Sequence, residues 1–300
     1  MMNEDLNILR KTALLVNKWV NRDDFLIYGG LISDLLLGKM NYGSDIDIAF
    51  KYKGENQILD VIKSLYDNDF NIVADRDYYI RNTHYVRLLY AIKDEIFLDI
   101  AFMNDPYEVG VLTMDSVFYC NQLGELIDNY GGINALEEKH ICLREDAKNE
   151  NPLYIINRLV CVSAKYDISL RDKETKKIIA EKSLKDICKN NIDKDTLAAF
   201  LSRLIKSIIK AKDQKQFIRE LIDEDIIGGI FPILHIILDR TLLNGRYNNS
   251  SSKEEFIKNT YKEANNRFEL EELEKSFSYF RYRTWSNDEF RLAHIYPNRF

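Results

Sequence analysis

The feature that most constrains this chain is a pair of aspartates inside an apolar run near the N-terminus. Asp45 and Asp47 are separated by Ile46 and followed by Ile48. Because side chains alternate between the faces of a strand, a strand here puts both carboxylates on one face and both isoleucines on the other. Two adjacent carboxylates repel each other unless a cation neutralises them. Hard oxygen ligands suit Mg²⁺, so the pair predicts a metal site.

A Gly-Gly pair upstream of the aspartates predicts a phosphate site. Gly29 and Gly30 follow the apolar run at 25–27 and precede a short helix expected over 31–37. Glycines let the backbone approach a ligand closely, and amides at a helix N-terminus favour an anion. The metal and phosphate features therefore lie next to each other, between two strand-like runs.

The segment 28–50 resembles the DNA polymerase β-like nucleotidyltransferases. It looks most like the head of the bacterial tRNA nucleotidyltransferases and poly(A) polymerases, the class II CCA-adding type, whose motif runs GGxxRDxLLG and then DxD. The resemblance implies an α+β fold, in which a nucleotidyltransferase head with a small mixed or antiparallel sheet is followed by an all-helical body. Ser33 stands where the family has arginine. The matching positions are Gly29, Gly30, Asp34, Leu36, Leu37, Gly38, Asp45 and Asp47.

The resemblance also implies a third carboxylate and a set of nucleotide-binding residues. In that superfamily an aspartate on a neighbouring strand completes the metal site, and Asp99 is the candidate here; the open alternative is a surface aspartate on an edge strand. Asp45, Asp47 and Asp99 are thus the expected catalytic residues and the expected ligands of two Mg²⁺ ions. The expected nucleotide-binding residues are Gly29, Gly30, Ser33, Asp34, Ser44, Thr113, Asp115 and Arg158.

Several arginines of the family motifs are missing from this chain. Where the family carries RRDFxxN, the sequence at 109–115 reads VGVLTMD, with Asp115 in the place of the asparagine. In the helix that begins EDPLR in the family, Tyr154 and Asn157 occupy the two arginine positions of this chain. Arg158 follows the second of these positions by one residue, which turns its side chain about 100° around the helix. Such arginines hold phosphate oxygens or read a base. We therefore expect metal-assisted chemistry with an altered choice of nucleotide or acceptor.

The apolar pattern of the first third predicts the head, residues 1–116. A helix is expected over 6–20, where apolar residues recur at helical spacing. Two strand-like runs at 85–92 and 96–102 are separated by a short charged segment at 93–95, which predicts a hairpin.

The rest of the chain is expected to be helical from residue 117 onward. Residues 117–243 form the predicted neck and body, in which 131–132 are turn glycines and Pro152 lies early in a helix. Residues 244–300 hold a polar linker at 244–253, a charged helix and an aromatic-rich tail. The tail interleaves rings with arginines, so it either packs on the body or stacks bases, and its small surplus of positive charge favours packing.

The composition predicts a globular protein of the reduced cytoplasm. The chain has 300 residues, of which 46% are hydrophobic and 30% charged, and no apolar run approaches the roughly 20 residues of a membrane span. The N-terminus lacks the apolar stretch of a signal peptide, and the four cysteines form no CxxC pair. The net charge of −6 suits nucleotide or small-molecule substrates and requires a local basic patch for any RNA.

The function expected from these features is transfer of a nucleoside monophosphate from ATP or CTP to an acceptor hydroxyl. The family resemblance implies that the acceptor is the 3′ end of a tRNA or another RNA, and neither a membrane nor DNA is an expected partner. Two alternatives stay open: a small hydroxylated or phosphorylated acceptor, and a non-catalytic binding protein with this fold. The three carboxylates favour an enzyme, because a protein without metal chemistry has no reason to keep mutually repelling acids.

Overall fold

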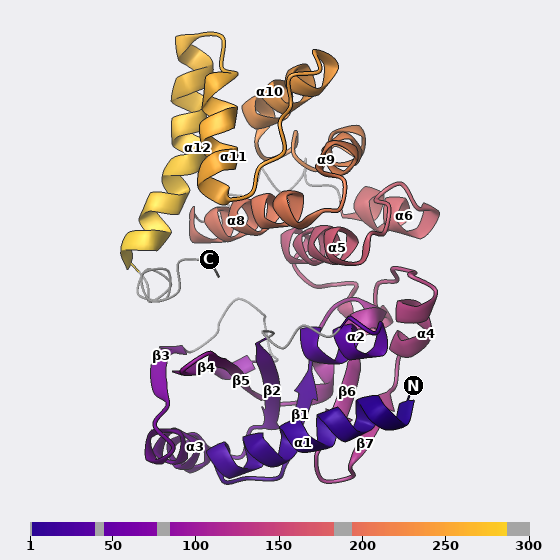
Figure 1. The fold of residues 1–300 in the computed structure, drawn as a ribbon, viewed down its shortest axis with the longest axis vertical. Helices are drawn as coiled ribbons and strands as arrows, with labels where there is room; N and C mark the ends of the chain where they lie inside the picture. Colours follow the sequence, from indigo (N-terminus) through magenta and orange to yellow (C-terminus); the bar gives the residue numbers. More distant parts are fainter. Residues whose placement is uncertain (1, 40–44, 77–84, 183–193, 287–300) are drawn as a thin grey trace. The chain divides into compact units, whose positions relative to one another are not determined.

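The computed structural model describes residues 2–39, 45–76, 85–182 and 194–286. The chain divides into two compact units, Met1–Lys148 and Asn149–Phe300, and each is described by itself (Figure 1). Within the described ranges, no helix combines the length and the apolar character needed to cross a membrane.

A mixed sheet forms the centre of the first unit. Among the described residues it has seven strands, in the order β3-β4-β5-β2-β1-β6-β7. The pair β2 and β5 is parallel, and the other neighbouring strands are antiparallel. This confirms the α+β fold with a mixed sheet in the head. The strands are β1 (Phe25–Tyr28), β2 (Ile46–Lys51), β3 (Asn71–Arg76), β4 (Tyr85–Lys93), β5 (Ile96–Met103), β6 (Val117–Cys120) and β7 (Glu125–Asp128).

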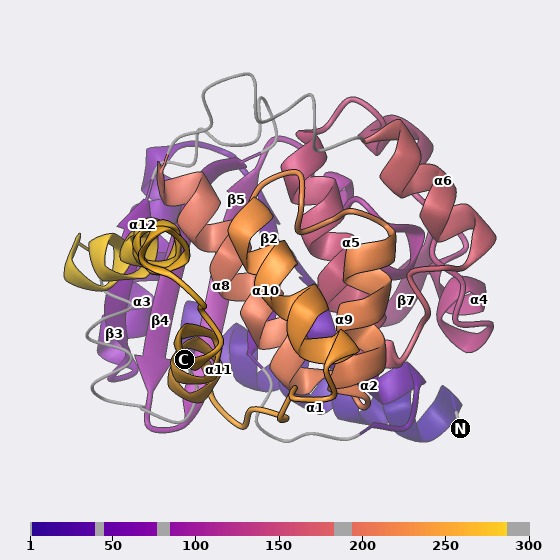
Figure 2. The same cartoon turned by 90° about the horizontal axis from the view of Figure 1, so that it is seen from above.

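Two helices, α1 (Met2–Val20) and α3 (Glu55–Asp67), cover one face of this sheet (Figures 1 and 2). Strand residues of this face, such as Ile48 and Phe50, are fully buried, as are Val16 on α1 and Val61 on α3. The large apolar layer between helices and sheet holds the strands in register, so that the opposite face can carry polar groups. The other helical elements of the unit are α2 (Gly30–Leu36), α4 (Gly132–Glu137) and the 3-10 turns η1 (Pro106–Glu108), η2 (Thr113–Asp115) and η3 (Glu145–Ala147).

Local sequence signals in the head are confirmed by the structure. The helix expected over 6–20 lies within α1, and the hairpin turn at 93–95 joins β4 to β5 with Asp94 at a positive φ of 52°. Gly131 is the N-cap of α4 and Gly132 is its first residue, and both oxygens of the Asp128 carboxylate accept hydrogen bonds from the first amides of that helix. The N-terminus of α4 is thus capped by the protein itself, as expected for a structural turn.

The expectation of helices from residue 117 onward is wrong. Residues 117–128 form β6 and β7, and β6 pairs with β1 inside the sheet of the head. The first compact unit therefore extends to Lys148 and not to residue 116. Short strands of four residues carry too little periodicity to be distinguished from helical segments by sequence pattern alone.

The second unit is helical throughout its described part. Pro152 is the first residue of α5, as predicted, and Asn151 caps that helix by accepting a hydrogen bond from the amide of Leu153. An all-helical body after the head is thereby confirmed. The helices are α5 (Pro152–Tyr166), α6 (Lys173–Glu181), α8 (Lys194–Lys210), α9 (Gln214–Asp223), α10 (Pro232–Leu243), α11 (Lys253–Lys262) and α12 (Arg267–Ser286).

The polar segment at 244–253 does not separate two domains. Gln214 accepts hydrogen bonds from the hydroxyl of Tyr247 and the amide of Ser250, and it donates one to the carbonyl of Ser250. These buried contacts tie the segment to α9, which a polar composition alone could not predict. Most of the aromatic-rich tail lies outside the described residues, but Phe277 packs edge-on against Tyr261.

Candidate active site

Two of the predicted carboxylates lie side by side on the sheet. Asp47 on β2 and Asp99 on β5 are direct partners in the parallel pair, so both side chains project from the same face, on strands that lie about 4.8 Å apart. This is the face opposite α1 and α3. Tyr28 is the partner of Asp47 on the next strand, and Tyr90 is the partner of Asp99. The order Tyr90, Asp99, Asp47, Tyr28 forms a row across four strands.

The Gly-Gly turn is in contact with this row. Gly29 follows β1 with φ 77° and ψ −144°, a conformation that L-residues rarely adopt. A Cβ atom at this position would overlap Oδ2 of Asp47 and lie 3.1 Å from its Cγ. The turn backbone is therefore packed directly against one carboxylate, and only glycine allows that approach.

The side chains of α2 that were predicted to bind nucleotide are buried. Ser33 is 4% exposed and its hydroxyl donates to the carbonyl of Gly29, while Asp34 is 6% exposed. Gly30 is the first residue of α2. The roles of these three residues toward a nucleotide stay predictions, and Ser44 lies outside the described residues.

The three-carboxylate metal site also stays a prediction. Asp45 is exposed immediately before β2, and Asp99 is half-buried with its Oδ1 shielded from solvent. Within the described residues, no group of three His, Cys, Asp or Glu side chains converges to hold a metal ion. The register thus joins Asp47 to Asp99, and Asp45 lies two residues before Asp47, just outside β2.

Thr113 and Asp115 lie on η2, in the segment that replaces the arginine motif of the family. Asp115 is 5% exposed, and Thr113 has a buried hydroxyl whose oxygen has no hydrogen bond within the described structure. A Cβ on Gly110 would lie 2.9 Å from the Cβ of Asp115, so the chain is tightly packed here. Contact of either side chain with a nucleotide stays a prediction, and their burial favours a structural role.

Arg144 is a residue that sequence reasoning missed. Its guanidinium is buried, with 2% of the residue exposed, and it donates to the carbonyls of Val109, Gly110 and Tyr107. It also lies over the ring of Tyr130, donates to that hydroxyl and pairs with Asp146. Arg144 therefore fixes the segment at 107–110, which packs on the carboxylate face beside Ala49 and Ala101. No local pattern in the sequence marks this position, because all its partners except Asp146 are distant in the chain.

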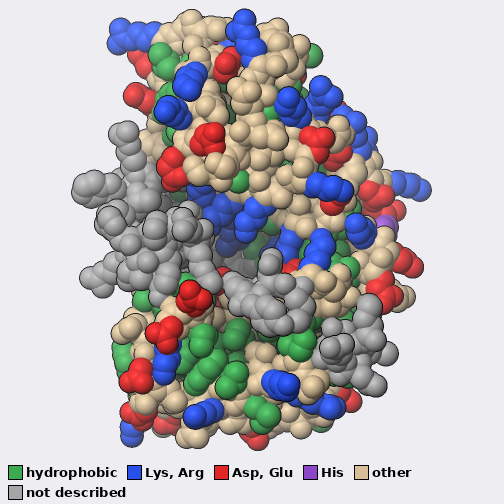
Figure 3. Space-filling model, in the orientation of Figure 1, with side chains coloured by type: hydrophobic (Ala, Val, Ile, Leu, Met, Phe, Trp, Pro, Cys, Tyr) green, Lys and Arg blue, Asp and Glu red, His purple; other side chains and the backbone are tan. Residues whose placement is uncertain are grey.

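Arg158 lies on α5, in the second unit, and its role toward a nucleotide stays a prediction. Arg158 also belongs to a set of basic side chains on α5 and α8, which we call the basic stripe. Arg158 and Lys165 lie seven residues apart on α5, and Arg203, Lys206 and Lys210 follow one side of the neighbouring α8. Figure 3 shows Lys and Arg side chains gathered over these two helices.

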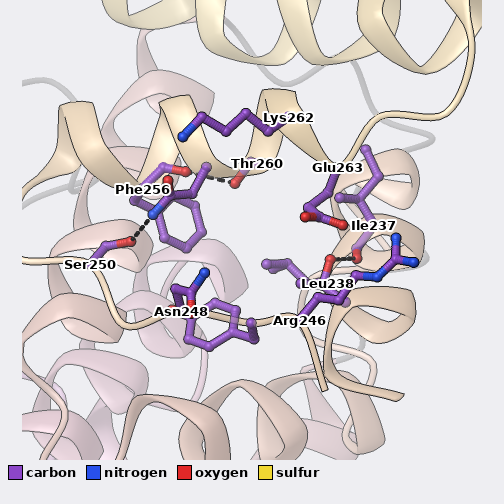
Figure 4. Close-up of a pocket in the computed structure, with 12 residues that line it drawn as sticks. Ile237, Leu238, Arg246, Asn248, Ser250, Phe256, Thr260, Lys262 and Glu263 are labelled. Atoms are coloured by element: carbon purple, nitrogen blue, oxygen red, sulfur yellow. Dashed lines mark hydrogen bonds between the residues drawn. The ribbon is translucent and has the colours of Figure 1, made fainter. Parts of the chain in front are cut away.

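A cavity of about 80 Å³ lies in the second unit between α10, the segment after it and α11 (Figure 4). The hydroxyls of Thr241 and Thr260, which line it, donate to carbonyls of their own helices. None of the predicted site residues lines this cavity, so it is separate from the candidate site.

The structure is similar to those of several solved proteins, three of which are as follows. A CCA-adding enzyme in complex with CTP has a TM-score of 0.60 at 18% identity, covering 92% of this chain and 69% of that one. The Thermotoga maritima CCA-adding enzyme complexed with tRNA has a TM-score of 0.51 at 18% identity, covering 96% and 74%. A tRNA-processing enzyme complex has a TM-score of 0.54 at 13% identity, covering 94% and 84%.

The chain has the fold of the CCA-adding enzymes. The resemblance carried by the GGLISDLLLG and DID segments is thereby confirmed at the level of the fold. No protein-family model matches the chain, and comparison with curated protein sequences gives no significant match.

Proposed function

We propose that this chain is a metal-dependent nucleotidyltransferase that transfers a nucleoside monophosphate from ATP or CTP to the 3′ hydroxyl of a tRNA or another RNA. One observation carries the proposal. Asp47 and Asp99 stand side by side on parallel strands with Gly29 packed against Asp47, in a fold shared with CCA-adding enzymes that were solved with CTP, ATP and tRNA.

The residues present fit a divalent cation. Two neighbouring carboxylates, one with an oxygen shielded from solvent, repel each other and favour a bound cation. Mg²⁺ is usually held by one or two carboxylates together with substrate phosphates, so a preformed cage of three side chains is not required. Asp47 and Asp99 would hold the metal, with Asp45 as a third ligand. Bound there, Mg²⁺ would activate the acceptor hydroxyl and stabilise the pyrophosphate leaving group.

The protein's own residues would position the metal ligands and the two substrates. Ile48 on β2 and Ile100 on β5 are register partners and fully buried on the opposite face, and the same register aligns Asp47 with Asp99. Gly29 keeps its turn close to Asp47, which leaves its backbone next to the place where the triphosphate would lie. Arg144 fixes the segment at 107–110 on the same face. The basic stripe on α5 and α8 supplies the local positive charge that an acidic chain needs to bind RNA.

The proposal is tested by incubating the protein with each labelled NTP, with and without tRNA, in the presence of Mg²⁺. We expect label in the RNA, and we expect Asp47→Asn and Asp99→Asn to lower the rate by about 100- to 1,000-fold, the usual effect of removing one transition-state contact. Asp60→Asn, on the exposed side of α3, is the matched control and should keep the wild-type rate. Thermal unfolding of each variant checks that a lower rate does not come from loss of the fold.

Other outcomes would redirect the assignment. Label that enters a small hydroxylated compound but not RNA would identify a different acceptor for the same chemistry. Absence of transfer together with absence of Mg²⁺-dependent NTP binding in calorimetry would refute an enzyme and leave a binding protein with this fold.

A further inference from the structure

Two aromatic side chains flank Asp99 on the carboxylate face. Tyr90 on β4 is the direct partner of Asp99, and Phe97 lies two residues before Asp99 on β5, so all three project from one face. Both rings are half-buried, neither fully covered nor fully exposed. The ring of Tyr90 packs on the apolar cluster that includes Leu88 and Ala101. It is therefore held in place before any ligand arrives.

The order of the strands separates the two sides of the carboxylate pair. Gly29 and β1 lie on the Asp47 side, which is where the turn backbone closes on the sheet. Tyr90 lies on the Asp99 side, on β4, and Phe97 lies on β5 itself, two residues before Asp99. The residue next to Tyr90 on β3 is Ala74, whose small side chain adds little bulk to this side. A triphosphate next to Gly29 leaves the aromatic side for the second substrate.

We infer that Tyr90 and Phe97 bind the terminal nucleoside of the acceptor by stacking, and so place its hydroxyl at Asp99. This inference rests on the proposed nucleotidyl transfer. It identifies the acceptor as one whose last residue carries a nucleobase. Aromatic stacking tolerates any base because every base offers a π-face. It requires no arginine, which agrees with the loss of the arginine motifs from this chain. A small aliphatic alcohol would gain nothing from these rings.

The test replaces each ring and measures the two substrates separately. Tyr90→Leu and Phe97→Leu should each raise the KM for the RNA acceptor by about 5- to 150-fold, the range produced by losing one base–aromatic stack, with the KM for the NTP unchanged. Tyr90→Phe and Phe97→Tyr keep a ring and should restore acceptor binding. Tyr66→Leu, on α3 at the opposite face and 57% exposed, is the control for the substitution itself.

A second readout does not depend on turnover. A single-stranded oligoribonucleotide with a 5′ fluorescein and a free 3′ hydroxyl is titrated against each variant by fluorescence anisotropy, and thermal unfolding confirms that each variant is folded. The leucine variants should bind it more weakly than wild type and than Tyr66→Leu.

The outcomes separate this inference from the proposed function. If wild type transfers label but the leucine variants keep the acceptor KM, or raise the KM for the NTP instead, the rings are not an acceptor site. If wild type transfers nothing, the proposed function fails, and the anisotropy titration still decides whether the rings bind a nucleoside end. Equal binding by wild type and leucine variants overturns the inference in either case.

Discussion

The contact between Gly29 and Asp47 makes a sharp prediction for Gly29→Ala. The new Cβ would overlap Oδ2 of Asp47. The carboxylate end of the side chain is the part that can give way, and it has to move by about 1 Å to restore an ordinary contact. Misplacement of that size at a reacting centre costs about 100-fold in rate. We therefore expect Gly29→Ala to lower nucleotidyl transfer by about 100-fold.

The effect of backbone strain at Gly29 on stability must be separated from the effect of the contact with Asp47 on the rate. Gly29 has a conformation close to one that only glycine adopts readily, and replacing such a glycine costs about 1–3 kcal/mol of stability. Gly54 offers a matched control, because it has φ 121° and ψ 167° and a Cβ there would meet nothing within 4 Å. Gly54→Ala should show the same loss of stability without the loss of rate.

The assay compares the two variants in two measurements. Urea unfolding gives the free energy of unfolding of each, and the labelled-NTP assay gives the rate per folded molecule. A Gly29→Ala protein that transfers at the wild-type rate, or whose rate falls only as far as that of Gly54→Ala, would refute the claim that the turn positions Asp47.

Three further predictions concern buried polar contacts. Arg144→Met should destabilise the first unit by about 1–3 kcal/mol in urea unfolding, because it leaves buried carbonyls without their hydrogen-bond donor; an unchanged midpoint would contradict this. Gln214→Leu should cost about 1–3 kcal/mol, since the hydroxyl of Tyr247 loses its buried partner, and a limited-proteolysis time course should show earlier cleavage at 244–253. Hydrogen bonds from Arg240 lower the pKa of Glu269 below its usual 4.5, so their ion pair stabilises the second unit above about pH 4.5 and is lost as the pH falls through the lowered value. Glu269→Gln should therefore remove part of the acid dependence of the unfolding midpoint, and an identical pH profile would show that this pair contributes nothing.

Much of the head could be predicted because its signals are local. Alternation along 45–50 determines which side chains of β2 share a face, and the structure shows Ile48 and Phe50 buried under α1 and α3. The hairpin at 93–95 is likewise set by residues next to it in the chain, and so, in the second unit, is the start of α5 at its proline. In each case the deciding interaction spans fewer than about ten residues.

What escaped prediction depends on distant partners. The residues of β6 do not reveal that it pairs with β1, about 90 residues earlier, and the sequence pattern alone therefore places them in the helical part. The segment at 244–253 looked like a linker because its polar side chains gave no sign that Gln214 would bind them. Arg144 shows the same limit, since a buried cation is unfavourable until the fold brings several carbonyls to it.

The buried state of Arg144 also bears on the missing arginine motif. The segment at 109–115 stands where the family carries two arginines, and its residues are instead packed into the protein: Val109 and Asp115 are both at most 5% exposed. Arg144, the arginine that contacts this segment, already binds carbonyls and Asp146, so it has no donors to offer a triphosphate. In the proposed site, cations bound at Asp47 and Asp99 would supply positive charge for the phosphates that this segment does not. A site of the proposed kind would recognise the phosphates through a bound metal and the acceptor through Tyr90 and Phe97, so the carboxylates could still serve in a chain without the family's arginines.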